Sequence, residues 1–214
     1  MSEQPEELKE INKFYLLAIN VLFAVVVGLS FETTAKLSFP PENISIFIKL
    51  FALVLIYYVI FSSWLGHYRS QTHWPYSIGL LGKVRFVISV SILYIYYHAF
   101  YLFANNSNGL FYYVFPLIFL AYLAYDTVKN IEYKDDSEGG VDLINRLLIT
   151  LLFLAFFISA SYIFYLFITD NIPPVLNVGV LDSWKIEFLL IFSVLMGVYR
   201  YKKRRIKSEL RFTT

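Results

Sequence analysis

The chain has 214 residues, a formal net charge of +2, no cysteine, and 58% hydrophobic against 16% charged residues. Soluble proteins carry about 25% charged residues, so this composition excludes an ordinary soluble domain and favours a membrane protein. The absence of cysteine excludes disulfide bonds, thiol catalysis and thiolate metal sites.

Six apolar stretches predict an all-α polytopic membrane protein with six transmembrane helices. Each is close to the roughly 20 residues that cross a bilayer as a helix. The stretches lie at Phe14–Phe31, Ile44–Tyr68, Val84–Ala104, Leu110–Lys129, Leu147–Ile168 and Lys185–Tyr201. The remaining segments are too short to bury a core of their own. We therefore expect an N-terminal segment (1–13), a six-helix domain (14–201) and a basic tail (202–214).

Lysine and arginine fall almost entirely on one side of the expected membrane. Of the 18 such residues, only Lys36, Lys49 and Lys185 fall on the other side. Because basic loops stay in the cytoplasm, both termini are predicted to be cytoplasmic. We expect an integral protein of a prokaryotic inner or plasma membrane, with membrane lipids as partners.

The first predicted helix carries a face of small and polar residues. Asn20, Ala24 and Gly28 recur every four residues and therefore lie on one side of the helix. Such a face permits close helix packing, with Asn20 as a polar link between helices. The alternative is that this face borders an oligomeric pore, or that the neighbouring face does so, which bears Leu22, Val25, Val26 and Leu29.

The second predicted helix ends in a group of aromatic and polar residues that includes Trp64, His67 and Arg69. A belt of aromatic residues and a cation at the membrane interface would account for them without any function. The alternative is that Trp64 and His67, three residues apart on one face, hold a gate or an assembly contact.

Three ionisable residues lie within or near the third and fourth predicted helices. His98 lies among tyrosines, which favours a packed histidine over a proton or substrate site. The short turn Asn105–Gly109 predicts that the third and fourth helices form an antiparallel hairpin. Arg85 opens this hairpin and Asp126 closes it, so we expect these two side chains to form an ion pair.

Motifs of common enzymes are missing from the sequence. It contains no His-Glu-x-x-His, no Gly-x-Ser-x-Gly and no P-loop. We therefore expect neither catalysis nor a cofactor nor a metal site.

The end of the chain is strongly basic. Cations at this position attract anionic lipids of the inner leaflet, and in an oligomer several such tails could bind an anionic cytoplasmic ligand. A nucleotide, a nucleic acid and an acidic protein all remain candidates for that ligand. The residues concerned are Arg200, Lys202, Lys203, Arg204, Arg205 and Lys207.

Two segments resemble a known family. The run from Asn20 to Val27, followed by Glu32, and the ending Trp64-x-x-His67 resemble the first two helices of the bacterial and lysosomal six-helix potassium channel family. Asn20 stands where that family has an aspartate. The resemblance implies a homo-oligomer around a potassium pore lined by the first helix. It implies constriction residues at Leu22, Val25, Val26 and Leu29.

These observations predict a homo-oligomeric ion channel or channel-like effector that is gated from the cytoplasmic side. The alternative is a non-conducting anchor or interaction subunit whose loops and tail recruit a soluble cytoplasmic partner. A small-solute transporter ranks third, because paired charges and broken helices are missing from the pattern.

Overall fold

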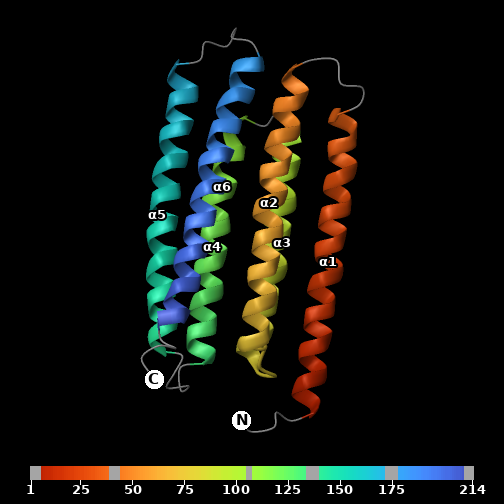
Figure 1. The fold of residues 1–214 in the computed structure, drawn as a ribbon, viewed down its shortest axis with the longest axis vertical. Helices are drawn as coiled ribbons and strands as arrows, with labels where there is room; N and C mark the ends of the chain where they lie inside the picture. The colour runs from red at the N-terminus through yellow and green to blue at the C-terminus, as the bar shows by residue number, and fades with distance from the viewer. Residues whose placement is uncertain (1–5, 39–43, 105–107, 134–139, 172–177, 210–214) are drawn as a thin grey trace.

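The computed structural model describes residues 6–38, 44–104, 108–133, 140–171 and 178–209, and every regular element in this part is a helix. This confirms the all-α class that the sequence predicts. The helices are α1 Glu6–Ser38, α2 Ile44–His73, α3 Leu80–Ala104, α4 Asn108–Glu132, α5 Gly140–Asn171 and α6 Val178–Glu209 (Figure 1).

The helices extend beyond the predicted apolar stretches. For example, α1 begins at Glu6 rather than at Phe14, and α6 continues to Glu209 rather than ending near Tyr201. Hydropathy marks only the apolar part of a helix, whereas backbone hydrogen bonds continue through polar turns at its ends. Much of the expected N-terminal segment and of the basic tail is therefore helical.

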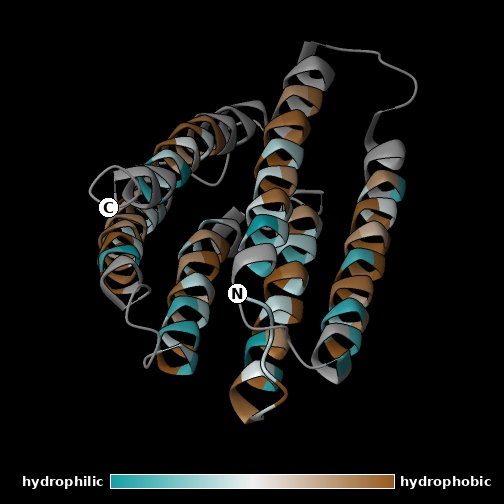
Figure 2. Ribbon diagram, turned by 60° about the horizontal axis from the view of Figure 1, so that its bottom comes forward, coloured by the Kyte–Doolittle hydropathy of each residue, from teal (hydrophilic) through white to brown (hydrophobic). Residues whose placement is uncertain are grey.

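The outer surface of the bundle has the apolar character of an integral membrane protein. Within the described residues, four helical segments are long and apolar enough to cross a bilayer, namely 10–32, 80–102, 112–132 and 144–166. Large apolar side chains such as Leu152 on α5 and Val54 on α2 are more than half exposed. Figure 2 shows hydrophobic turns along the described helices, with hydrophilic turns among them. That α2 and α6 also span the membrane stays a prediction.

The six helices form a closed ring. Neighbouring helices pack in the order α1, α3, α4, α5, α6, α2 and back to α1. In Figure 1, α2 and α6 lie in front of α3 and α4, with α1 and α5 at the two edges. The start of α1 and the end of α6 lie at the same end of the ring, which we call the basal end. The α2–α3 connection lies at this end too.

A proline in α4 shows how the ring compensates a lost backbone hydrogen bond. Pro116 lies inside the helix and has no N–H to donate to the carbonyl of Tyr112, four residues earlier. The buried Ser161 on α5 donates its hydroxyl to that carbonyl instead, at 2.8 Å. In a membrane, where water cannot replace the lost donor, such side-chain compensation permits proline within a helix.

Helix α1 is fastened to its neighbours by three polar contacts at different heights. Near the basal end, Asn12 Oδ1 accepts a hydrogen bond from the backbone N–H of Tyr76, at 2.7 Å. Midway, Asn20 Oδ1 accepts one from Trp64 Nε1, at 3.0 Å. Higher up, the hydroxyls of Ser30 and Tyr57 share a hydrogen bond of 2.9 Å.

Candidate functional site

A cavity of about 580 Å³ lies inside the ring, in its basal half, and all six helices contribute to its lining. The lining extends from Arg69 and Trp74 near the basal end of α2 to Ile60, higher in the same helix. Above Ile60 and Tyr96, the interior of the described part is filled by a continuous apolar core that includes Phe100, Phe119 and Phe192. The cavity is therefore closed towards the opposite end of the ring.

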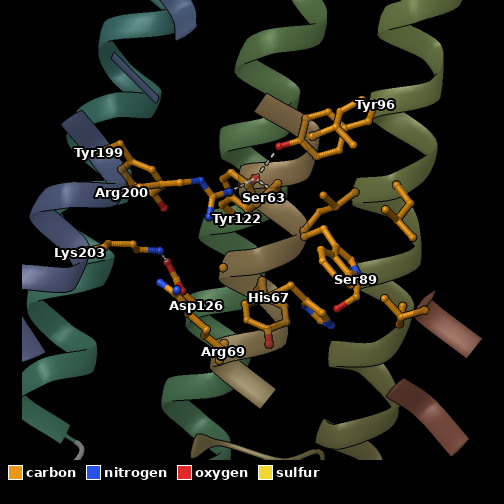
Figure 3. A pocket seen from close by; sticks show the side chains of 18 of the residues that line it. Ser63, His67, Arg69, Ser89, Tyr96, Tyr122, Asp126, Tyr199, Arg200 and Lys203 are labelled. Atoms are coloured by element: carbon orange, nitrogen blue, oxygen red, sulfur yellow. Dashed lines mark hydrogen bonds and ion pairs between the residues drawn. The ribbon is translucent and has the colours of Figure 1, made fainter. Parts of the chain in front are cut away.

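Cations outnumber carboxylates on the described wall of this cavity. The lining contains Arg69, Arg146, Arg200 and Lys203, but Asp126 as its one carboxylate. In Figure 3 the side chains of Arg200 and Lys203 reach from α6 towards the middle of the ring. A positively charged interior of this kind favours an anionic ligand, because buried charge needs compensation.

The side chain of Arg200 is held by the hydroxyl and the ring of Tyr122, both of which are neutral. Its Nη2 donates to the hydroxyl of Tyr122 at 3.1 Å, and its Cζ lies 5.9 Å from the centre of the Tyr122 ring. Its buried Nε has no hydrogen-bond partner, and among the described residues no carboxylate pairs with the side chain. Gly66 on α2 leaves the space that the guanidinium occupies, because a Cβ there would overlap Nη1.

Asp126 is the centre of the polar cluster that joins α4, α5 and α6. Its carboxylate pairs with the ammonium of Lys203 and accepts a hydrogen bond from Thr150 Oγ1 at 2.9 Å. The Thr150 hydroxyl also lies 2.8 Å from that of Tyr199. Burial lowers the pKa of Lys203, and the Asp126 carboxylate opposes this shift, while Arg146 adds to it.

The predicted ion pair between Arg85 and Asp126 is wrong. Arg85 pairs with Glu132 at 2.5 Å, whereas Asp126 pairs with Lys203. Asp126 and Glu132 are six residues apart on α4, which at 3.6 residues per turn places them on different sides of the helix. Glu132 faces α3, and Asp126 faces α6.

Arg85 organises the connection between α2 and α3. The side chain is fully buried, and it donates to the carbonyl of Trp74 at 2.7 Å and to Gln71 Oε1 at 3.3 Å. Glu132 also accepts a hydrogen bond from the backbone N–H of Ser77, at 2.7 Å. The pair therefore links α3 and α4 to the α2–α3 connection, which is a structural role.

A chain of hydroxyl groups crosses the cavity wall above Arg200. Tyr122 shares hydrogen bonds with Ser63 on α2 and with Tyr96 on α3. His67 lines the cavity one turn below Ser63, and its Nε2 lies 3.4 Å from the hydroxyl of Tyr76. Polar groups from four helices thus meet at the Tyr122 hydroxyl (Figure 3).

The two residues of the Trp64-x-x-His67 ending have different hydrogen-bond partners. Trp64 binds Asn20 and stacks on Phe23 of α1, with ring centroids 5.2 Å apart, so it joins α2 to α1. Both residues line the cavity, and the Nε2 of His67 faces the hydroxyl of Tyr76. Trp64 thus joins α2 to α1 within the subunit, and a role of Trp64 and His67 in a gate or an assembly contact stays a prediction.

The candidate pore residues of α1 divide into two groups. Leu22, Val25 and Leu29 are exposed on the outside of the ring, at 36%, 50% and 43%. Val26 is buried in the core, and the Oδ1 of Asn20 accepts a hydrogen bond from Trp64. Only the exposed three are placed to meet another subunit.

The remaining predicted residues lie in different surroundings. His98 stacks between the rings of Tyr94 and Tyr101, at centroid distances of 6.2 and 6.1 Å, as a packed histidine would. Of the basic residues near the end of the chain, Lys202 is exposed, whereas Arg200 and Lys203 line the cavity. The side chains of Arg204, Arg205 and Lys207 lie outside the described residues.

Sequence reasoning did not single out several members of this site. Gly66, Tyr96, Tyr122 and Arg146 carry no motif. Lys129, the last residue of the fourth predicted span, does not line the cavity. Lys129 is buried, and its Nζ donates to Ser70 Oγ at 3.0 Å. One signal was present, because Arg200 and Lys203 are three residues apart and so share a face of α6.

Within the described residues, no group of three or more His, Asp or Glu side chains is arranged to hold a metal ion. Comparisons with protein-family models, with curated proteins and with solved structures find no match to this chain.

Proposed function

We propose that this chain is a homo-oligomeric, channel-like effector of the membrane, gated from the cytoplasmic side by an anion that binds in the basal cavity. The observation that supports this proposal is a cationic cavity inside a bundle whose outer surface is apolar. Ionisable side chains are costly inside a membrane protein and are retained where they serve function.

The basal end is proposed to face the cytoplasm. Arg69, Lys129, Arg146, Arg200 and Lys203 all belong to the basal half of the ring, as the preference of basic residues for the cytoplasmic side requires. An anion from the cytoplasm could then reach the cavity without crossing the apolar core.

The conduction path is proposed to run between subunits rather than through one. The apolar core closes the ring above the cavity, so a single subunit offers no open path in this state. The exposed face of α1 that bears Leu22, Val25 and Leu29 could line a path where several copies meet. The resemblance of the first two helices makes potassium the first ion to test.

The test is ion flux through purified protein in liposomes, measured for potassium and for chloride with and without phosphate on the basal side. We expect flux that changes with phosphate in the native protein and does not change in Arg200→Gln. Lys202→Gln is the matched control, because Lys202 is a neighbouring cation of α6 that is exposed. Flux that responds equally in both variants contradicts the proposal.

A non-conducting anchor is the second candidate. It is favoured by the continuation of α6 to Glu209, which carries the exposed Lys202 past the predicted end of the span. The same experiment separates the two: folded, oligomeric protein that conducts neither ion under any condition supports the anchor and rejects the channel.

A further inference from the structure

The cavity changes character along the ring axis. Its basal part carries the charged side chains of Arg200, Lys203 and Asp126. Its inner part is lined by Ile60 on α2 and by Ile92 on α3. Ile60 and Gly66, whose backbone the Arg200 guanidinium approaches, are six residues apart on α2, or about 9 Å at 1.5 Å per residue, so the charged part lies below the apolar part.

The cations of α6 are arranged to hold one multivalent anion. Arg200 and Lys203 lie on one face of the helix, less than one turn apart. Lys203 already has the Asp126 carboxylate as a partner, whereas Arg200 has the neutral Tyr122 hydroxyl and an unpaired Nε. A guanidinium in that situation is suited to a phosphate, which it can bind through two parallel hydrogen bonds.

The inner wall is suited to an apolar or aromatic group. Tyr96 presents a large ring there, beside the aliphatic side chains of Ile60 and Ile92, and Tyr122 lies between this wall and Arg200. A volume of about 580 Å³ is larger than a phosphate ion needs, and it falls within the range of pockets that hold organic ligands, about 300–1,000 Å³. The space above the cations is therefore large enough for an organic group attached to the phosphate.

We infer that the cavity binds an organic phosphate, with the phosphate at Arg200 and Lys203 and an apolar or aromatic body against Ile60, Ile92 and Tyr96. This inference rests on the proposed function and names the class of its anion. Two sources share this chemistry: a soluble nucleotide that enters from the basal end, and a lipid phosphate that enters from the inner leaflet. The charged part at the basal end and the apolar part deeper in the ring suit both.

The test is direct binding to the purified full-length chain in nanodiscs of zwitterionic lipid. The probes are inorganic phosphate, adenosine 5′-monophosphate and lysophosphatidic acid, with adenosine and lysophosphatidylcholine as the matching compounds that lack a free phosphate group. We expect one organic phosphate to bind at least about tenfold more tightly than inorganic phosphate, because it also buries its body. Which of the two binds identifies the source.

Two groups of variants check where the ligand binds. Arg200→Gln should weaken binding of the organic phosphate at least about tenfold, since a hydrogen bond to a charged group contributes about 1.5–3 kcal/mol. Arg200→Lys should recover part of it, and Lys202→Gln should leave it unchanged. Ile92→Ala, which changes the apolar wall without touching the hydroxyl network, should weaken the organic phosphate and leave inorganic phosphate unchanged. Thermal unfolding and size-exclusion profiles establish that each variant is folded.

The outcomes are decisive in each direction. Absence of binding by every probe overturns the inference, as does equal affinity for inorganic phosphate or an affinity that Arg200→Gln does not change. Failure of the proposed function is distinguishable, because binding that leaves flux unaltered rejects gating and retains the ligand class. Gating by inorganic phosphate alone rejects the ligand class and retains gating.

Discussion

The guanidinium of Arg200 on α6 lies against the backbone of Gly66 on α2, in the space that a side chain at position 66 would occupy. The glycine therefore admits a cation between α2 and α4, where it meets the hydroxyl of Tyr122. Position 66 lies within the segment Phe61–Arg69 at the basal end of α2. Because glycine has no side chain, it leaves room for the charge of Arg200 in the cavity.

Gly66→Ala should separate stability from ligand binding. The added Cβ overlaps only the far end of a flexible side chain, so Arg200 moves and the helices remain in place. Alanine favours a helix over glycine by up to about 1 kcal/mol, so stability should stay the same or rise. Phosphate affinity should fall about tenfold. Thermal unfolding and phosphate titration measure the two quantities.

Gly28→Ala is the control for that substitution. A Cβ at Gly28 meets nothing within 4 Å, so this variant should gain helix stability and keep its phosphate affinity. Equal phosphate affinities of the two variants would contradict the placement of Arg200 in the binding site.

Asp126→Asn should strengthen phosphate binding and weaken the unliganded protein. The substitution keeps the shape of the side chain but removes the negative charge that partners Lys203. We expect a loss of about 1–3 kcal/mol in stability without ligand, and affinity for phosphate about tenfold higher. The rise in unfolding temperature on adding phosphate should therefore exceed that of the native protein. A smaller rise would show that Lys203 does not contact the anion.

Removal of Arg85 should be among the most destabilising single changes. Arg85→Met leaves the buried carboxylate of Glu132 without its cation, which costs about 3–5 kcal/mol. The double variant Arg85→Met with Glu132→Leu should recover most of this loss, because no unpaired charge remains. Unfolding in increasing concentrations of a denaturing detergent measures the stability of the single and the double variant. Additive losses in the double variant would exclude the pair as the cause.

The contribution of Ser161 should depend on Pro116. Ser161→Ala removes the hydroxyl that donates to the buried carbonyl of Tyr112, and we expect a loss of about 1–3 kcal/mol. In a Pro116→Ala background the restored backbone N–H can bond that carbonyl, so the same substitution should cost much less. A double-mutant cycle by thermal unfolding checks this, and equal costs in the two backgrounds would reject the compensation.

Val25→Asn should change ion flux if copies meet along α1. Val25 is half exposed on α1, and Val194 on α6 is similarly exposed, so Val194→Asn provides a matched control on another helix. We expect an altered flux in Val25→Asn and native flux in Val194→Asn, both measured in liposomes. The reverse result would place the conduction path along α6.

The fold could be predicted from the sequence because a bilayer imposes a simple rule. Apolar stretches of about 20 residues must be helices, and this places α1, α3, α4 and α5 without reference to packing. The helix ends could not be predicted, since hydropathy does not distinguish polar helical turns, such as those from Glu6 to Lys13, from polar loops.

The site was less accessible to sequence reasoning. The predicted pairing of Arg85 with Asp126 was wrong, because pairing depends on which face of α4 each helix approaches. Arg200 and Lys203 were predicted to bind anionic lipid or an anionic cytoplasmic ligand together with four neighbouring cations, because a run of cations gives no indication of which members turn inward. Only the ring arrangement, with Gly66 opposite α6, reveals that two of them line a cavity.

The three polar contacts of α1 define its register against the rest of the ring. Apolar contacts alone would hardly resist a slide, because lipid chains can replace a neighbouring helix at little cost. Asn12, Asn20 and Ser30 bind partners on two different elements at three heights. A slide by one helical turn, about 5.4 Å, would break these three contacts together. The three contacts thus fix the position of α1 along the ring axis. Every subunit of an assembly would therefore present Val25 at the same depth of the membrane.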